Sequence, residues 1–253
     1  MAPLPTLALA RLIVSAYLRD DFLLIIIYGN LRMGKSAYAI KVMGQVYDYL
    51  RGRPLSIDLV DEYLAWHPND VIQKWTEITK RIPMFIWDDA GYWLFSMNWH
   101  DPLMIEIQKY FNLVGTDMNT LVLTTPDPTW ILSKLLNMPG TVRVKVMKRD
   151  GGISDTPTAL YRREARGYKP YRSPDLKKHG VNRILTDQFS CYIPDEIYAF
   201  YQPRREHYTR IAKARMRDVL LSKIKGEGGV ERPQIDERIK VAVDSVKHRN
   251  REE

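Results

Sequence analysis

Short apolar runs alternate with segments of helical spacing along residues 1–140. The run Phe22–Tyr28 is continuously apolar and rich in isoleucine, which is typical of a fully buried strand. Before it, Thr6–Arg19 carries apolar residues at near-helical spacing. After a glycine-containing turn over 29–34, the apolar positions of Ser36–Tyr47 recur with the period of a helix. These patterns predict, in order, a helix, a buried strand, a turn and a second helix.

The alternation of strand and helix continues toward residue 140. Short apolar segments predict strands, and segments that follow turn or capping residues predict helices. Strands that alternate with helices predict a mostly parallel sheet with helices on both faces, which is an α/β fold. The further strands are expected at Glu62–His67, Pro83–Trp87 and Thr120–Thr125, and the helices at Pro68–Lys80, His100–Phe111 and Pro128–Leu136.

From residue 141 onward the pattern changes. Three valines, Val142, Val144 and Val146, alternate with arginine and lysine residues. The segment Arg149–Gly152 then carries a strong turn signal. We therefore expect a β-hairpin with one basic face.

Beyond this hairpin the chain is predicted to be loop, helix and tail. Ser173–Gly180 is loop-like, a helix is expected over Glu196–Lys223, and the glycines of 226–229 break it. Residues 230–253 are highly charged, as in a mobile tail or a lone helix. We divide the chain into a core at 1–140, a basic hairpin and helix at 141–225 that complete or extend it, and a charged tail at 226–253.

The net charge of +8 is concentrated in the second half of the chain. Counting lysine and arginine against aspartate and glutamate gives −2 for residues 1–142, +9 for 143–215 and +1 for 216–253. A basic segment of this kind either holds a polyanion such as DNA through phosphate contacts or is a solvated basic surface. We predict DNA as a partner of residues 143–215.

The apolar runs and the cysteine content indicate where in the cell the protein is expected. The longest apolar run falls far short of the ~20 residues that span a bilayer, and Met1–Ala10 has no basic leading segment. Cys191 is the single cysteine, which excludes an internal disulfide and a cysteine-rich metal site. We expect a cytoplasmic protein, in a host cell if the chain is viral, with no membrane partner.

The pattern G-x-x-x-x-G-K-[ST] of a phosphate-binding loop is matched by Gly29-Asn-Leu-Arg-Met-Gly34-Lys35-Ser36. Its glycines let backbone N–H groups cradle phosphate oxygens at the N-terminus of the following helix. Lys35 would reach the β- and γ-phosphates as a catalytic residue, and the Ser36 hydroxyl would ligate Mg²⁺. The predicted nucleotide-binding residues are Gly29, Asn30, Leu31, Arg32, Met33, Gly34, Lys35, Ser36 and Ala37.

Two carboxylates, Asp88 and Asp89, follow the buried strand that ends at Trp87. Ligands bind at the carboxyl edge of an open α/β sheet, so this is a Walker B pattern. Asp88 would hold Mg²⁺ through water, and Asp89 would polarise or deprotonate the attacking water. Glutamate is the commoner residue at the second position, and its longer side chain reaches further.

Two hydroxyls, those of Thr124 and Thr125, end the predicted fourth strand at the same sheet edge. One of them is well placed to contact the γ-phosphate or the attacking water, and the strand-end position alone does not choose firmly between them. We take Thr124 as the candidate. The alternative is that threonine is present here because it favours strands.

These blocks together resemble a group of AAA+-like P-loop ATPases encoded by archaeal spindle-shaped viruses, the fuselloviruses, and by related plasmids. The likeness covers about residues 20–215, and its second block is more distinctive than a phosphate loop alone. The matching blocks are Gly29–Ser36 with Ala37-Tyr38-Ala39, Ile86–Trp93 with its Asp88-Asp89-Ala90-Gly91-x-Trp93 core, and Thr124-Thr125-Pro126-x-Pro128.

The resemblance implies an additional-strand P-loop fold, ATP as the nucleotide, and a part in viral or plasmid DNA replication or its control. The group is sometimes described as replication-initiator-like. A homo-oligomer is a further expected partner, and a neighbouring subunit could then donate Arg143, Arg162 or Arg163 to the active site. Nothing in the sequence selects among these arginines.

Three other functions share parts of this pattern. A HerA/FtsK-like ATPase that packages or translocates DNA has the same motifs but requires a stable ring. A nucleotide-gated binding module would use ATP only to switch conformation, and aspartate at position 89 keeps that alternative open. A small-molecule kinase is the weakest alternative, because it leaves the basic segment without a role.

Overall fold

The computed structural model describes residues 3–95, 102–149, 162–172 and 179–226 of the chain. These residues belong to two compact units, Met1–Arg205 and Glu206–Glu253. The described part of the second unit, residues 206–226, is helical. All of the strands, and all of the predicted site residues, belong to the first unit.

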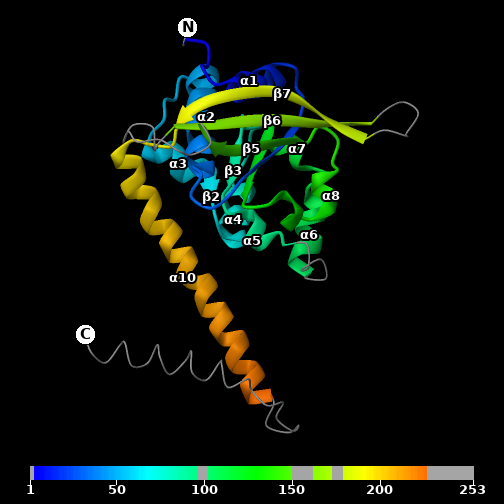
Figure 1. Ribbon diagram of the computed structural model, residues 1–253, viewed down its shortest axis with the longest axis vertical. Helices are drawn as coiled ribbons and strands as arrows, with labels where there is room; N and C mark the ends of the chain where they lie inside the picture. Colours follow the sequence, from blue (N-terminus) through cyan, green and yellow to red (C-terminus); the bar gives the residue numbers. More distant parts are fainter. Residues whose placement is uncertain (1–2, 96–101, 150–161, 173–178, 227–253) are drawn as a thin grey trace. The chain divides into compact units, whose positions relative to one another are not determined.

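One sheet of seven strands organises the first unit (Figure 1). The strands are β1 (Leu23–Tyr28), β2 (Leu64–Ala65), β3 (Phe85–Trp87), β4 (Thr120–Thr125), β5 (Val142–Lys148), β6 (Arg162–Arg172) and β7 (His179–Ser190). Their order is β2-β3-β4-β1-β5-β6-β7. The pairs from β2 to β5 are parallel, whereas β6 pairs antiparallel with β5 and β7.

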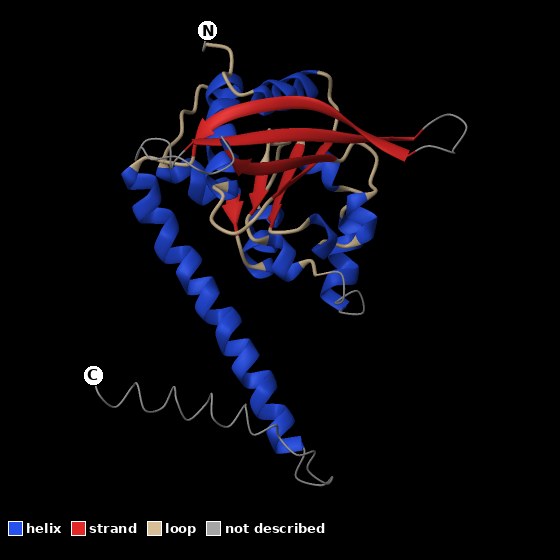
Figure 2. Cartoon of the chain, viewed as in Figure 1, coloured by secondary structure: helices blue, strands red, loops and turns tan. Residues whose placement is uncertain are grey.

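Helices flank the parallel part of the sheet on both faces (Figure 2). On one face α1 (Ala8–Leu18) packs on α2 (Lys35–Arg51), and α2 contacts β1 and β4.

Within the described residues, no helix is both long enough and apolar enough to cross a bilayer. The other helices are α3 (Ile57–Tyr63), α4 (Pro68–Thr76), α5 (Ala90–Trp93), α6 (Pro102–Tyr110), α7 (Val114–Asp117), the 3-10 helix η2 (Pro128–Trp130), α8 (Ser133–Leu136) and α10 (Asp195–Gly226).

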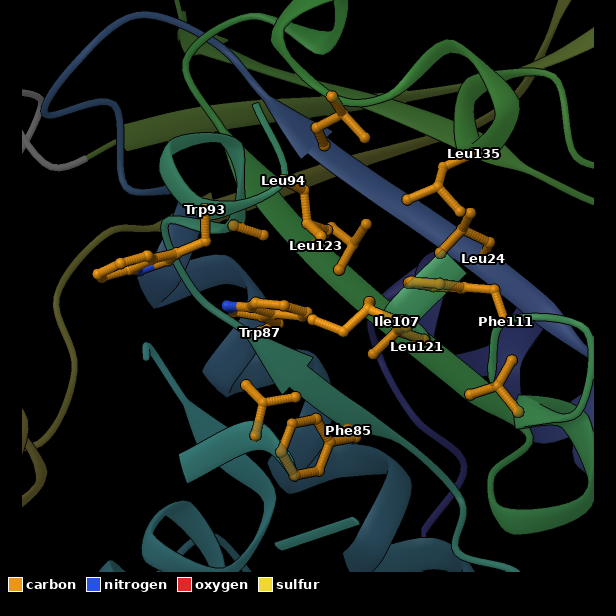
Figure 3. Close-up of a cluster of buried hydrophobic side chains, with 14 of the residues drawn as sticks. Leu24, Phe85, Trp87, Trp93, Leu94, Ile107, Phe111, Leu121, Leu123 and Leu135 are labelled. Atoms are coloured by element: carbon orange, nitrogen blue, oxygen red, sulfur yellow. The ribbon is translucent and has the colours of Figure 1, made fainter. Parts of the chain in front are cut away.

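The second face of the parallel strands is covered by an aromatic and aliphatic core from α4 to α8 (Figure 3). Trp87 of β3 is fully buried at its centre, and its indole N–H donates to the carbonyl of Trp66 at 3.0 Å. Each large apolar side chain buried in this way contributes about 1.5–3 kcal/mol. The members labelled in the figure are Leu24, Phe85, Trp87, Trp93, Leu94, Ile107, Phe111, Leu121, Leu123 and Leu135.

The strand order confirms the predicted additional-strand P-loop fold. β4 lies between β1, which leads into the phosphate loop, and β3, which ends at the two aspartates. The continuous apolar run of β1 is buried from Leu23 to Ile27, as expected for a central parallel strand. β5, β6 and β7 extend the same sheet, and the predicted division at residue 140 stays a prediction.

Three predicted elements were wrong in extent, and of these the helix expected at Pro68–Lys80 ends at Thr76. The strand expected at Glu62–His67 is only Leu64–Ala65, because α3, capped by the Ser56 hydroxyl, runs through Tyr63. The helix expected at Pro128–Leu136 is broken at Ile131, which is extended and bridges Phe95. The chain therefore makes one 3-10 turn and one short α-helix there.

The expected basic hairpin exists as the antiparallel pair β5–β6, but its strands are joined by residues 149–161. Most of the tight turn predicted at Arg149–Gly152, most of the loop at Ser173–Gly180, and the whole tail from residue 230 lie outside the described residues. The long pair β6–β7 was not predicted. Its antiparallel register is interrupted between Gly167 and Tyr168, which weakens the alternation that marks a strand in sequence.

A buried carboxylate from β7 caps the first helix of the chain. The first residues of α1 have no capping side chain of their own, since Leu7 stands at the N-cap. Asp187 accepts hydrogen bonds from the backbone N–H groups of Ala8 and Leu9 at 2.6 and 3.0 Å, and from the hydroxyl of Tyr38 at 2.6 Å. One end of the sheet is thereby tied to both helices of the first face.

We predict that Asp187→Ala lowers the free energy of unfolding by about 2–4 kcal/mol, because it leaves buried donors without their charged acceptor. Urea denaturation would measure this loss. Gln188→Ala, at the exposed neighbouring position of β7, should change stability by less than about 0.5 kcal/mol. Equal effects of the two substitutions would show that the capping contact is unimportant.

Candidate functional site

The phosphate loop is a tight turn between β1 and α2 whose two glycines are enclosed by later parts of the chain. Gly29 has φ +146°, and a side chain there would meet the carbonyl oxygen of Val146 at 2.3 Å. Gly34 has φ +87°, and a side chain there would meet the Cβ of Cys191 at 2.6 Å. Both positions therefore require glycine for backbone conformation and for space.

The N-terminus of α2 opens onto this loop without a capping side chain, since Gly34 is the N-cap residue. Unpaired N–H groups and the positive end of the helix dipole favour an anion at this point. The ammonium of Lys35 donates to the carbonyls of Gly29 and Asn30 at 2.9 and 3.0 Å. Burial lowers the pKa of Lys35, and the carboxylates of Asp89 and Asp88 oppose this shift.

The loop exposes the residues between its glycines. Asn30, Leu31 and Arg32 are exposed, and Met33 is partly buried. Because these side chains are exposed, the backbone N–H groups of this segment are the groups expected to cradle phosphate. Ser36 and Ala37 follow in the first turn of α2 and are partly buried.

Asp88 is fully buried and collects hydroxyl groups from three other elements. Its Oδ1 accepts hydrogen bonds from Ser36 at 2.9 Å and from Thr124 at 2.6 Å, and its Oδ2 accepts one from the Tyr201 hydroxyl. Burial raises the pKa of Tyr201 well above its ordinary value, so this phenol remains a donor. The contact brings the phosphate-loop helix and the carboxyl edge of the sheet together at one side chain.

The strand register explains how Asp88 reaches this place. Trp87 of β3 lies opposite Leu123 of β4, so the next residues along the two strands, Asp88 and Thr124, also meet. The backbone N–H of Asp88 donates to the carbonyl of Ala65 at 2.8 Å, which continues the pairing with β2 past the last strand residue. Both parallel neighbours thus hold the carboxylate at the sheet edge.

Asp89 stands at the turn into α5 with a left-handed backbone, φ 51°. Aspartate tolerates this conformation better than most residues do. Its backbone N–H donates to the Thr124 hydroxyl oxygen at 2.8 Å, and its carboxylate pairs with Arg205 at 3.1 Å. Burial and the charge of Asp88 raise the pKa of Asp89, while Arg205 and Lys35 lower it.

The two threonines that end β4 have different partners. The hydroxyl of Thr124 donates to Asp88 and accepts from the backbone of Asp89. The hydroxyl of Thr125 points elsewhere and donates to the carbonyl of Asp127 at 2.8 Å. The single proton of the Thr124 hydroxyl is therefore used on a carboxylate, which makes this residue a positioning group for the two aspartates.

The oxygen atoms of Ser36 and Asp88 form a donor pair that suits Mg²⁺. Magnesium is commonly held by one or two protein oxygens together with water and substrate phosphates. Among the described residues there is no cluster of three or more histidine, cysteine, aspartate or glutamate side chains of the kind that forms an all-protein metal cage. The site fits an ion that arrives with a nucleotide.

Three residues contact this site in a way that the sequence did not predict. Tyr201 and Arg205 were not named as site residues, and Arg163 was considered only for donation to a neighbouring subunit. Tyr201 and Arg205 lie one helical turn apart on α10, 113 and 116 positions beyond the aspartates that they contact. Arg163, from β6, donates through Nε to the carbonyl of Met33 in the phosphate loop at 3.2 Å. The one available sequence signal was the i, i+4 spacing of a tyrosine and an arginine on a predicted helix.

The arginines considered for donation by a neighbouring subunit are differently placed. Arg163 is buried against its own phosphate loop, and Arg143 donates to the carbonyl of Leu136 at 3.2 Å. Arg162 is exposed on β6. The contacts of Arg163 and Arg143 lie within their own chain.

We predict that Thr124→Val destabilises the protein by about 1–3 kcal/mol, because the Asp89 N–H loses its acceptor and the buried Asp88 Oδ1 loses one of its two donors. Thr124→Ser keeps the hydroxyl and should recover most of this loss. Chemical denaturation of both variants measures the change in the free energy of unfolding. A Thr124→Ser protein that is destabilised as much as Thr124→Val would show that the hydroxyl alone does not restore stability, and would contradict the prediction.

Comparison with known sequences gives one archaeal viral relative. The chain is 25% identical over 219 residues to an uncharacterised protein, B-251, of Sulfolobus spindle-shape virus 1, with 85% of this chain and 86% of that protein covered. No family model matches the sequence. The likeness to a spindle-shaped-virus protein agrees with the coarse part of the predicted resemblance, and membership of a replication-initiator group stays a prediction.

Solved structures with similar folds superpose only loosely. The N-terminal domain of zonular occludens toxin from Neisseria meningitidis gives a TM-score of 0.36 at 13% identity, with 66% of this chain and 95% of that chain covered. The genome packaging NTPase B204 from Sulfolobus turreted icosahedral virus 2, solved with ATP-gammaS, gives 0.35 at 14% identity, with 66% and 99% covered. The P-loop NTPase fold of this chain is defined by its own strand order and phosphate loop.

Proposed function

We propose that this protein binds Mg²⁺-ATP at the loop of Gly29–Ser36 and hydrolyses it. The observation that carries the proposal is the hydrogen bond between Ser36 and the buried Asp88, which joins the phosphate loop to the carboxyl edge of the sheet. An ordinary glycine turn has no reason to hold a fully buried carboxylate against its first helical hydroxyl. ATP as the particular nucleotide follows from the resemblance to viral and plasmid ATPases.

Each residue has a role that its contacts support. Bound ATP with Mg²⁺ supplies the reactive γ-phosphate and a cation that neutralises its oxygens. Lys35 holds its ammonium at the mouth of the loop on two carbonyls, and it can transfer these hydrogen bonds to phosphate oxygens. Ser36 would ligate the cation, and Asp88, which accepts the Ser36 hydrogen bond, would hold it through water. Asp89 orients or deprotonates the attacking water, and Thr124 holds both aspartates in place.

A nucleotide-gated module with negligible turnover is the alternative at the same site. The ion pair between Asp89 and Arg205 favours it, because a carboxylate bound to a guanidinium is a weaker base. Hydrolysis then requires that Asp89 be released when the nucleotide is present. Turnover assays separate the two functions.

We predict that Lys35→Ala and Asp89→Asn each lower Mg²⁺-ATP hydrolysis by at least about 100-fold, because each removes a charge that acts on the transferring phosphate or on the water. Lys35→Ala should also weaken binding of ATP, whereas Asp89→Asn should retain it. Phosphate release and fluorescent-nucleotide titration measure the two effects. Wild type that binds ATP but never turns it over, with or without DNA, would leave the nucleotide-gated module as the function.

A DNA partner is supported by one face of the sheet extension. Along β7, Leu185, Asp187 and Phe189 are buried toward the first helices, and the residues between them are exposed. The strand register places five cations on this second face, whereas Lys148 and Arg163, which lie opposite each other, belong to the other face. We define it as the basic face, formed by Arg143, Lys145, Arg162, Arg166 and Arg183.

The charge of this face is little compensated by its own acids. Glu164 is the acidic residue at these face positions of the described strands, and it is paired with Arg166. Lys145, Arg162 and Arg183 are exposed. An array of exposed cations on neighbouring strands fits the phosphate backbone of DNA without requiring a particular sequence. We propose that ATP hydrolysis acts on DNA bound there, in replication, its control, or packaging.

We predict that the triple variant Lys145→Ala, Arg162→Ala, Arg183→Ala binds double-stranded DNA more weakly, and by a similar factor for all sequences. The slope of log affinity against log salt should fall in magnitude by up to about 3, because each lost phosphate contact releases about one counterion fewer. Fluorescence anisotropy at several salt concentrations measures both the affinity for DNA and its dependence on salt.

A second triple variant, Arg19→Ala, Arg53→Ala, Lys109→Ala, removes the same charge from exposed or half-buried positions outside the basic face and serves as the control. An equal loss of DNA affinity in both triple variants would show that net charge alone binds DNA. The translocating or packaging ATPase further requires a ring, so the oligomeric state in the presence of nucleotide separates it from an initiator or a regulatory ATPase.

A further inference from the structure

The first turns of α10 make two separate contacts with the Walker B carboxylates. The Tyr201 hydroxyl donates to Asp88, and the guanidinium of Arg205, four residues later, pairs with Asp89 at 3.1 Å. Residues four apart lie on the same side of a helix, so one face of α10 meets both aspartates. Tyr201 also packs on the ring of Trp66, with centroids 5.4 Å apart, and is buried.

The two contacts differ in their surroundings. Tyr201 is almost fully buried, so its bond to Asp88 anchors this part of the helix. The side chain of Arg205 is 42% exposed and that of Asp89 is 38% exposed, so their ion pair lies at an opening of the site. The charge of Arg205 acts on Lys35 as well as on both aspartates. The guanidinium therefore contacts the proposed water-activating carboxylate, and its charge also influences the proposed phosphate-binding lysine.

We infer that Arg205 is the arginine that contacts the γ-phosphate, and that it acts within its own chain. This inference rests on the proposed ATPase function. When a triphosphate enters the loop beside Lys35, its terminal phosphate brings negative charge next to Arg205. A planar guanidinium matches phosphate oxygens and can exchange its bond to Asp89 for one to phosphate. That exchange also frees the carboxylate to act on water.

The geometry favours action within one chain over donation from a neighbour. Arg205 belongs to the same compact unit as the phosphate loop and both aspartates. Tyr201 fixes the helix one turn earlier, so the position of Arg205 needs no second subunit. Arg163 and Arg143 already donate to carbonyls of their own chain, as described above.

The test compares Arg205→Ala and Arg205→Lys with Arg204→Ala. Arg204 is the adjacent exposed arginine, which stacks on the Phe200 ring and lies 3.9 Å from Asp61, so its loss removes the same charge without touching the site. Arg205→Ala should lower kcat at least about 100-fold and change KM for ATP much less. Arg205→Lys should recover part of this loss, and Arg204→Ala should stay near wild type. Unchanged kcat in Arg205→Ala would overturn the inference.

Mixing two inactive variants separates action within a chain from action between chains. Lys35→Ala retains Arg205, and Arg205→Ala retains the phosphate loop. If Arg205 acts in its own chain, an equimolar mixture has no more activity than the two variants apart. Recovery of activity in the mixture would mean that Arg205 serves a neighbouring subunit, and would overturn the inference.

A binding measurement distinguishes failure of this inference from failure of the proposed ATPase function. Wild type should bind ATPγS more tightly than ADP, and Arg205→Ala should lose about tenfold of this preference while its affinity for ADP stays unchanged. If wild type shows no turnover yet Arg205→Ala loses the preference, hydrolysis is refuted and the γ-phosphate contact stands. If the preference persists in a folded Arg205→Ala protein, the inference fails whatever the turnover.

Discussion

A buried charge has to be satisfied, and in this protein the charge of Asp88 is satisfied by hydroxyl groups from three separate parts of the chain. A carboxylate without water is costly unless hydrogen-bond donors replace its hydration. Ser36 brings the start of α2 to it, Thr124 brings the end of β4, and Tyr201 brings the first turns of α10. The arrangement of the site is therefore set by one side chain directly after β3.

The same carboxylate gives the site its electrostatic character. Asp89 pairs with Arg205, and the charges of Lys35, Asp88, Asp89 and Arg205 influence one another. A bound triphosphate and its cation would add negative and positive charge to this group. The most favourable hydrogen-bond partners of Lys35 and Arg205 would then change. Lys35 rests on two backbone carbonyls and Arg205 on Asp89, and both contacts can be exchanged for phosphate.

The three strands added beyond β1 serve different purposes on their two faces. The inner face supports the phosphate loop, through Val146 against Gly29 and Arg163 against Met33, and it caps α1 through Asp187. The basic face carries the exposed cations Lys145, Arg162 and Arg183. Because alternate residues of a strand point to opposite faces, one set of strands can both brace the nucleotide site and offer a surface to a polyanion.

Much of the fold and the central motifs followed from the sequence because they are local. β1, the phosphate loop and α2 form one continuous segment, and the buried strands β3 and β4 have apolar runs that end in the polar residues of the site. The type of each element and the sheet edge on which the motifs lie could therefore be predicted. Short elements could not, because α3 and the broken helix after β4 depend on a single cap and a single bridge.

Tertiary structure decided which distant side chains complete the site. Sequence could not choose between Thr124 and Thr125, because that choice depends on which face of β4 meets Asp88. It also could not place Tyr201 and Arg205 on the aspartates, or Asp187 on α1, since these contacts join residues more than a hundred positions apart. The local sequence determined the phosphate loop, the two aspartates and the strands that they follow. The packing of distant segments determined which side chains contact the charged groups.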